Sequence, residues 1–154
     1  NKDDTGKKID IKARKFLKKE GQDYAHGTGH GVGFFLNVHE GPQAISKYNT
    51  VKIEKGMILS NEPGYYKENH FGIRIENLIY VKQLKNKLCF ENLTMAPIEK
   101  DLINYKLLNK IEKDYLFKYH LKIYSDCAFF LFSNFFFCPI SELHCCTSLQ
   151  NVKS

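Results

Sequence analysis

The chain contains the segment His26-Gly27-Thr28-Gly29-His30-Gly31-Val32-Gly33, and the segment His39-Glu40-Gly41-Pro42 follows closely. Imidazole is the commonest side-chain ligand of metal ions in proteins and the usual proton carrier near neutral pH. Glycine lets the backbone approach a metal ion or a substrate without obstruction by a Cβ atom. Because alternate glycines disfavour a helix, we expect residues 26–33 to form an extended or looped segment that takes part in chemistry.

Length and composition indicate one globular domain. The 154 residues are 43% hydrophobic and 26% charged, which suffices for one core. Residues 1–20 hold eight Lys and Arg against four Asp and Glu, and so carry four of the six excess positive charges. No nucleic-acid reading motif accompanies this excess, so we expect a solvated helix face and no nucleic-acid partner. A dinucleotide-binding Gly-x-Gly-x-x-Gly loop is excluded, because Val32 and Phe34 stand where its third glycine would be.

The cysteines and the apolar segments bear on location. Cys89 stands alone, and the other four of the five cysteines fall in the last thirty residues. An odd number without a regular framework indicates a reducing compartment, so we expect a cytoplasmic protein. The Phe-rich run over residues 128–140 is shorter than the roughly 20 residues of a membrane span, so no membrane partner is expected.

Hydrophobic periodicity predicts two amphipathic helices. Asp4 and Thr5 can cap the first helix, which we expect to end at Gly21 in a left-handed turn. The second helix is predicted over about residues 101–119. The apolar faces are predicted to consist of Ile9, Ala13, Phe16 and Leu17 in the first helix, and of Leu107, Leu108, Ile111, Tyr115 and Tyr119 in the second.

Three strands are predicted between the helices. Residues 57–61 are a short apolar run that a Pro-Gly turn stops, which leaves Glu62 at the end of a strand. Apolar and polar residues alternate over 71–81, and a third strand is predicted over 93–97. Residues 43–56, rich in Lys and polar groups, are predicted to form a surface connection. The two faces of the second strand would carry Ile73, Ile75 and Ile79 on one side and Arg74 and Glu76 on the other.

Three residues on separate elements are candidate metal ligands: His30, Glu62 and Glu76. One imidazole with two carboxylates suits Mn²⁺, Co²⁺, Fe²⁺ or Zn²⁺ better than an ion that prefers thiolates. Each residue also has a structural explanation. Glu76 could form a surface ion pair with Arg74, Glu62 could merely precede a turn, and His30 could be a loop histidine.

Four motifs occur in a fixed order. They are His26-Gly-Thr-Gly-His30-Gly-Val-Gly, Phe35-Leu-Asn-Val-His39-Glu-Gly-Pro42, Gly56-Met-Ile-Leu-Ser-Asn-Glu62-Pro-Gly-Tyr-Tyr66 and Phe71-Gly-Ile-Arg-Ile-Glu76-Asn77. In order and spacing they closely resemble the Xaa-Pro aminopeptidases (aminopeptidase P), and the resemblance extends from about Asp10 to about His120. It implies an α+β fold, the C-terminal part of a pita-bread (creatinase/aminopeptidase-like) fold, with an incomplete antiparallel sheet and flanking helices.

The resemblance also implies the composition of a metal site. His30 would be a metal ligand, Glu62 a terminal carboxylate ligand that can also take a catalytic proton, and Glu76 a carboxylate that bridges two metal ions. The complete enzyme would hold two divalent ions, with Mn²⁺ expected first and Zn²⁺ or Co²⁺ as alternatives. We expect the three side chains to converge on one concavity.

The remaining implied roles concern the substrate, a peptide with proline at the second position. His26 and His39 would line the cleft and assist the developing oxyanion or the leaving prolyl nitrogen. Arg74 would orient the carboxylates, and Tyr66 would help to shape the pocket. The implied reaction removes the N-terminal residue by attack of metal-activated hydroxide, and a homodimer is a possible state of the full-length enzyme.

The sequence departs from the family in one respect. The family has two further aspartate ligands on strands upstream of the histidine segment, whereas Asp3, Asp4 and Asp10 lie at the start of the first helix. Residues 1–124 are therefore interpreted as the C-terminal part of a catalytic domain that is inactive alone. Residues 125–154 are interpreted as a divergent Phe/Cys-rich tail, from a frameshift, a rearrangement or a misread gene boundary, or as a partner-binding segment. The alternatives for the whole chain are a non-catalytic pita-bread-like binding module and a degenerate gene product.

Overall fold

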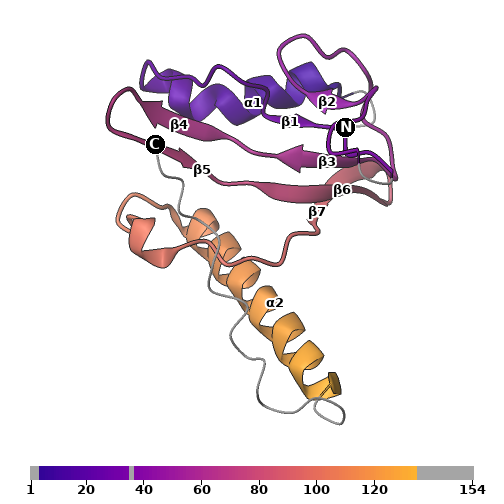
Figure 1. Ribbon diagram of the computed structural model, residues 1–154, viewed down its shortest axis with the longest axis vertical. Coiled ribbons are helices and arrows are strands. Elements are labelled where there is room, and N and C mark those ends of the chain that lie inside the picture. The colour runs from indigo at the N-terminus through magenta and orange to yellow at the C-terminus, as the bar shows by residue number, and fades with distance from the viewer. Residues whose placement is uncertain (1–3, 35–36, 135–154) are drawn as a thin grey trace. The chain divides into compact units, whose positions relative to one another are not determined.

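The computed structural model describes residues 4–34 and 37–134, which form two units that meet in sequence at Thr94 and Met95. Figure 1 labels the strands and the two α-helices in their order along the chain. The second unit contains η1 (Lys100–Leu102) and α2 (Lys110–Asn134). None of the helices described is both long enough and apolar enough to cross a membrane. The first unit contains α1 (Gly6–Lys19), β1 (Gly29–His30), β2 (Ala44–Ile45), β3 (Ile58–Asn61), β4 (Gly64–Lys67), β5 (Phe71–Arg74), β6 (Asn77–Leu84) and β7 (Lys87–Asn92).

Helix α1 has the ends that the sequence predicts. Thr5 is the N-cap, and its hydroxyl accepts a hydrogen bond from the N–H of Lys8. Gly21 follows the helix with a φ of 70°, a conformation that glycine adopts without steric cost. The predicted apolar face is wrong in one position, because Phe16 is 67% exposed. The helix instead buries Gly6, Asp10 and Arg14.

The central feature of the first unit is a long antiparallel hairpin. Strand β3 pairs with β6 in a register that matches Asn61 with Asn77, and β4 pairs with β5 so that Gly64 lies opposite Arg74. The two ladders share one register, since the N–H of Ile75 donates to the carbonyl of Pro63 between them. The strand predicted over 71–81 is therefore two strands that are separated at residues 75 and 76, and every residue of the first one is exposed.

The last strand of the first unit lies earlier than predicted. Strand β7 ends at Asn92, so the strand expected over 93–97 is wrong. It pairs with β6 through a turn in which Leu84 lies opposite Lys87 and Lys85 has a φ of 53°. A lysine in this left-handed conformation gives no sequence signal for a hairpin turn.

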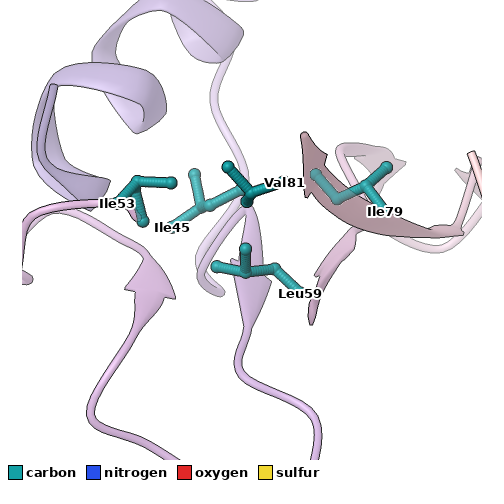
Figure 2. Close-up of a cluster of buried hydrophobic side chains, with 5 residues drawn as sticks. All are labelled: Ile45, Ile53, Leu59, Ile79 and Val81. Atoms are coloured by element: carbon teal, nitrogen blue, oxygen red, sulfur yellow. The ribbon is translucent and has the colours of Figure 1, made fainter. Parts of the chain in front are cut away.

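The core of the first unit combines side chains from β2, β3 and β6 with one from the loop between β2 and β3. Figure 2 shows these five aliphatic side chains together. Two of them lie in the segment 43–56, so the predicted surface connection is wrong at these two positions, although much of the segment is exposed. Ile45 lies where β2 pairs with β1, and the N–H of Ile53 donates to the carbonyl of Asp4. Local composition does not reveal these contacts between distant residues. The cluster consists of Ile45, Ile53, Leu59, Ile79 and Val81.

In the second unit, helix α2 begins later than predicted. Asn109 and Glu112 form a reciprocal capping pair, in which each side chain accepts a hydrogen bond from the other residue's N–H. The buried positions of the helix are Leu116, Tyr119 and Ile123, whereas Ile111 of the predicted stripe is 80% exposed. The helix runs without a break across residue 124, where the composition of the sequence changes.

Candidate active site

Strand β1 brings His30 against the end of β3. The N–H of His30 donates to the hydroxyl of Ser60 at 2.9 Å. A Cβ atom on Gly29 would overlap the carbonyl oxygen of Ser60, so this approach of β1 to β3 requires glycine. The Nδ1 atom of His30 lies 2.8 Å from the carbonyl oxygen of Gly31. Because a carbonyl only accepts, Nδ1 carries the proton and Nε2 is the atom that faces the site.

Glu62 is held by three groups. Its N–H donates to the carbonyl of Thr28 at 2.7 Å, which fixes the backbone at the end of β3. Its Oε1 accepts from the Ser60 hydroxyl at 2.8 Å, and its Oε2 accepts from Arg74 Nη1 at 3.1 Å. The Oε1 atom also lies 3.4 Å from His30 Nε2. The structure thus brings together His30 and Glu62, two of the predicted ligands.

A second set of polar contacts joins His26 to Arg74 through Tyr66. His26 Nδ1 lies 2.7 Å from the carbonyl oxygen of Gly27, so Nδ1 carries a proton. Its Nε2 lies 2.8 Å from the Tyr66 hydroxyl, which in turn accepts from Arg74 Nε at 2.8 Å. The hydroxyl hydrogen of Tyr66 is therefore directed to His26 Nε2. The hydrogen bond to Tyr66 raises the pKa of Arg74, with a smaller opposing effect of partial burial and support from the charges of Glu62 and Glu76.

Glu76 lies between β5 and β6 and is exposed. The shared register of the hairpin places it opposite Glu62. Residues directly opposite in an antiparallel pair have side chains on the same face, with Cβ atoms about 4.5–5.5 Å apart. Successive side chains of a strand alternate between its two faces. Because Ser60 and Tyr66 lie two and four residues from Glu62, and Arg74 lies two residues from Glu76, these polar side chains share one face of the hairpin.

His39 reaches the site from the loop before β2. Its ring centroid lies 4.0 Å from that of His30. The side chain is exposed, unlike that of His30, of which 21% is accessible. Four of the five predicted histidine and carboxylate residues thus line one region of the first unit: His26, His30, His39 and Glu62.

The donor atoms fit a divalent ion of intermediate softness. His30 Nε2 and Glu62 Oε1 lie 3.4 Å apart, and an imidazole nitrogen with a carboxylate oxygen is a set that Mn²⁺, Co²⁺ and Zn²⁺ accept. The proton on His30 Nδ1 is held by a backbone carbonyl, as is usual for a metal-binding histidine. Among the described residues, however, no group of three or more His, Cys, Asp or Glu side chains is close enough to hold a metal ion. The roles of His30, Glu62 and Glu76 as metal ligands stay predictions.

Sequence reasoning missed two contributors to the site. Ser60 is fully buried and connects the N–H of His30 to Glu62 Oε1. The sequence feature that could have identified Ser60 is a hydroxyl inside the apolar run 57–61. It lies two residues from Glu62 and hence on the same strand face. The second contributor is the pair of Asp10 and Arg14, buried on α1.

The chain matches known families over most of its length. Residues 2–83 match metallopeptidase family M24, and residues 86–141 match the C-terminal region of peptidase M24. The second match includes part of the segment 125–154 whose composition differs from the rest. The origin of that segment stays a prediction.

Curated relatives are named probable Xaa-Pro aminopeptidase P. The protein of Botryotinia fuckeliana is 50% identical over 132 residues, which cover 79% of this chain and 20% of the relative. The protein of Sclerotinia sclerotiorum is 49% identical over 132 residues, which cover 79% of this chain and 22% of the relative. The chain thus spans about a fifth of the length of these relatives.

Solved structures support the same family. X-prolyl aminopeptidase from Caenorhabditis elegans, described as a cytosolic enzyme with a di-nuclear active site, matches with a TM-score of 0.78 and 35% identity over 86% of this chain and 22% of that one. Prolidase from Pyrococcus furiosus matches with a TM-score of 0.53 and 33% identity over 60% of this chain and 26% of that one. These matches confirm the partial α+β pita-bread fold and the resemblance to Xaa-Pro aminopeptidases. The chain belongs to metallopeptidase family M24.

Proposed function

We propose that this chain supplies one side of the dinuclear metal site of an Xaa-Pro aminopeptidase, with His30, Glu62 and Glu76 as metal ligands. The observation that carries the proposal is the pair of His30 Nε2 and Glu62 Oε1, which lie 3.4 Å apart. The register position of Glu76 opposite Glu62 adds a second carboxylate on the same strand face. The names of the curated relatives support the reaction class.

Two divalent ions, Mn²⁺ in the first place and Zn²⁺ or Co²⁺ as alternatives, would supply an activated water and a Lewis acid for the scissile carbonyl. Glu62 is the residue that takes a proton, because its Oε1 faces the site. Arg74 holds the other oxygen of Glu62 and so fixes the orientation of the carboxylate. Ser60 donates to Oε1 from the buried side.

His26 and His39 face the substrate in this proposal. The Tyr66 hydroxyl donates to His26 Nε2, and Arg74 holds that hydroxyl in place. With both nitrogens protonated, His26 would donate through Nε2 to the Tyr66 hydroxyl, and that hydroxyl would then direct its own hydrogen to the developing oxyanion or to the leaving prolyl nitrogen. The substrate is a peptide with proline at the second position, and the enzyme is cytoplasmic, with a homodimer as a state of the full-length protein. The C. elegans enzyme, described as cytosolic, supports the location.

Metal binding by the purified chain tests the proposal. We expect Mn²⁺ to bind, by titration calorimetry and electron paramagnetic resonance, and His30→Gln, Glu62→Gln and Glu76→Gln each to weaken binding by roughly tenfold or more. His70→Gln and Glu68→Gln are matched controls, because both residues are exposed near the tip of the β4–β5 hairpin. Binding that survives substitution of His30 and Glu62 would contradict the proposed ligands. A chain that binds no divalent ion would favour the non-catalytic binding module instead.

A further inference from the structure

Helix α1 buries an ion pair beside the active-site segment. Arg14 Nε donates to Asp10 Oδ2 at 2.8 Å, and both side chains are 1% exposed. Spacing of four residues usually places such a pair on the surface of a helix. Here the pair faces inward, toward residues 23–28, which precede β1 and have no strand partner.

The remaining donors of Arg14 hold the backbone that leads to His26. Nη1 donates to Asp23 Oδ1 at 2.6 Å and to the carbonyl of Tyr24 at 2.7 Å, and Nη2 donates to the carbonyl of His26. The guanidinium carbon lies 3.9 Å from the centre of the Tyr24 ring. Two carbonyls of a segment that lies outside the strands are thus fixed by one rigid, planar group.

Asp10 holds the other end of the same segment. Thr28 donates through its hydroxyl to Asp10 Oδ1 at 2.6 Å, and the Tyr24 hydroxyl lies 2.5 Å from the Thr28 hydroxyl. The carbonyl of Thr28 accepts the N–H of Glu62. A chain of contacts therefore runs from Asp10 through Thr28 to the backbone of Glu62.

Stability alone does not account for such a pair. The desolvation cost of two buried charges is commonly as large as their attraction, and replacement by apolar side chains is often neutral or stabilising. The contacts of this pair converge instead on the backbone at His26 and, through Thr28, at Glu62. In the described residues every buried side-chain nitrogen and oxygen has a partner, so the network is complete.

We propose that Asp10 and Arg14 are positioning residues that fix the orientation of His26 and the backbone of Glu62. The inference rests on the proposed function of those two residues. It predicts that a substitution in the buried pair alters the tautomer of His26 even where the variant still folds.

The first test is the tautomer of His26 in the full chain, read by nitrogen-15 NMR of labelled histidines. In the wild type we expect His26 to show the form protonated at Nδ1. Arg14→Lys keeps the charge but loses the fork that reaches both carbonyls, so we expect loss of the single-tautomer pattern at His26. Lys15→Met, at an exposed position on the same helix, is the matched control and should leave the pattern unchanged. An unchanged pattern in Arg14→Lys would overturn the proposal.

The second test separates positioning from folding. The double variant Asp10→Leu/Arg14→Met removes both charges, and we expect it to keep a cooperative urea transition while the His26 pattern is lost. Unfolding of both variants would overturn the proposal, because the pair would then be part of the core only. We further expect Mn²⁺ to bind roughly tenfold more weakly to the double variant. If the wild type binds no Mn²⁺, the proposed function fails, and the His26 pattern alone decides the positioning role.

Discussion

Arg74 joins the two halves of the polar face of the hairpin. Its Nε donates to Tyr66, which contacts His26, and its Nη1 donates to Glu62, which contacts His30. Only a side chain with several donors in a fixed plane reaches both acceptors at once. At the scale of the residue, the geometry of one guanidinium therefore links the Tyr66–His26 contact to the Glu62–His30 contact.

We expect Arg74→Lys to weaken Mn²⁺ binding to the chain by roughly tenfold, because a single ammonium group cannot hold Tyr66 and Glu62 together. Titration calorimetry measures the change. Lys82→Met is the control, since Lys82 forms an exposed ion pair with Glu91 on β6 and β7, away from the site residues in sequence. Equal loss of binding in both variants would show that net charge, rather than the fork of Arg74, controls the affinity.

Asp23 makes the stability of the first unit depend on pH. Partial burial raises the pKa of Asp23, but hydrogen bonds from Arg14, from the N–H of Tyr24 and from Lys47 outweigh this effect and lower the pKa to about 2 from 3.8. The folded state thus favours the ionised carboxylate. The resulting stabilisation is fully present above the unfolded pKa and is lost as the pH falls through the folded pKa.

Urea unfolding between about pH 2 and pH 5 tests this linkage. We expect the free energy of unfolding to decrease as the pH falls from 3.8 toward 2, and Asp23→Asn to reduce that decrease. Asp101→Asn changes the net charge equally without removing a contact of Arg14, and serves as the control. A slope that is the same in the wild type and in Asp23→Asn would contradict the assignment.

At the scale of the element, the site depends on how closely β1 approaches β3. We expect Gly29→Ala to destabilise the first unit by about 1–3 kcal/mol, because its Cβ would overlap the backbone carbonyl of Ser60. Gly27→Ala is the matched control, since a Cβ there would lie 3.5 Å from the carbonyl of Ile45, an ordinary contact. Thermal unfolding compares the two variants. Equal stability of both would mean that β1 moves away from Ser60 without cost.

Helix α2 permits a separate test in the second unit. We expect Asn109→Ala to lower the stability of the helix by about 1 kcal/mol, because the first turn loses its capping acceptor. Hydrogen exchange at the N–H groups of the first turn would increase. Lys113→Ala, an exposed substitution in the same region, should not have this effect. Unchanged exchange in Asn109→Ala would contradict the capping role.

The sequence predicted the elements whose signals are local. Thr5 and Gly21 mark the ends of α1 through their own conformational preferences, and the structure confirms both. Asn109 and Glu112 carried an equally local signal for the start of α2. The prediction began the helix at about residue 101 instead, because it counted Leu107 and Leu108 in the apolar face. Ile45 and Ile53 could not be predicted as core, because their burial comes from contacts with distant strands.

The same distinction applies to the candidate site. The motifs identified His26, His30 and Glu62, and the structure places them in one connected set of polar contacts. Their spacing carried no information about Arg14, which acts through backbone carbonyls rather than through a motif. Support from backbone and buried groups of this kind requires the tertiary structure, since the partners are far apart in sequence.

At the scale of the whole molecule, the chain spans about a fifth of the length of its curated relatives. The resemblance implies five protein ligands for the metal site, and this sequence matches three of them. On that expectation Glu76 would bridge the two ions, and the two further aspartate ligands are not expected among the residues of this chain. The complete activity is therefore expected of an assembly of ligands larger than this segment provides.

We expect the purified 154-residue chain to release no N-terminal residue from a peptide with proline at the second position, with or without Mn²⁺. The reason is the ligand set that we propose: His30, Glu62 and Glu76 without the two further aspartates would hold one ion and leave the water and the scissile carbonyl without a second charge. Chromatographic detection of the released residue measures the reaction, and Glu62→Gln is the control for a contaminating peptidase. Release that requires Mn²⁺ and disappears in Glu62→Gln would contradict the expectation, since it would show that the ligands of this chain suffice for catalysis.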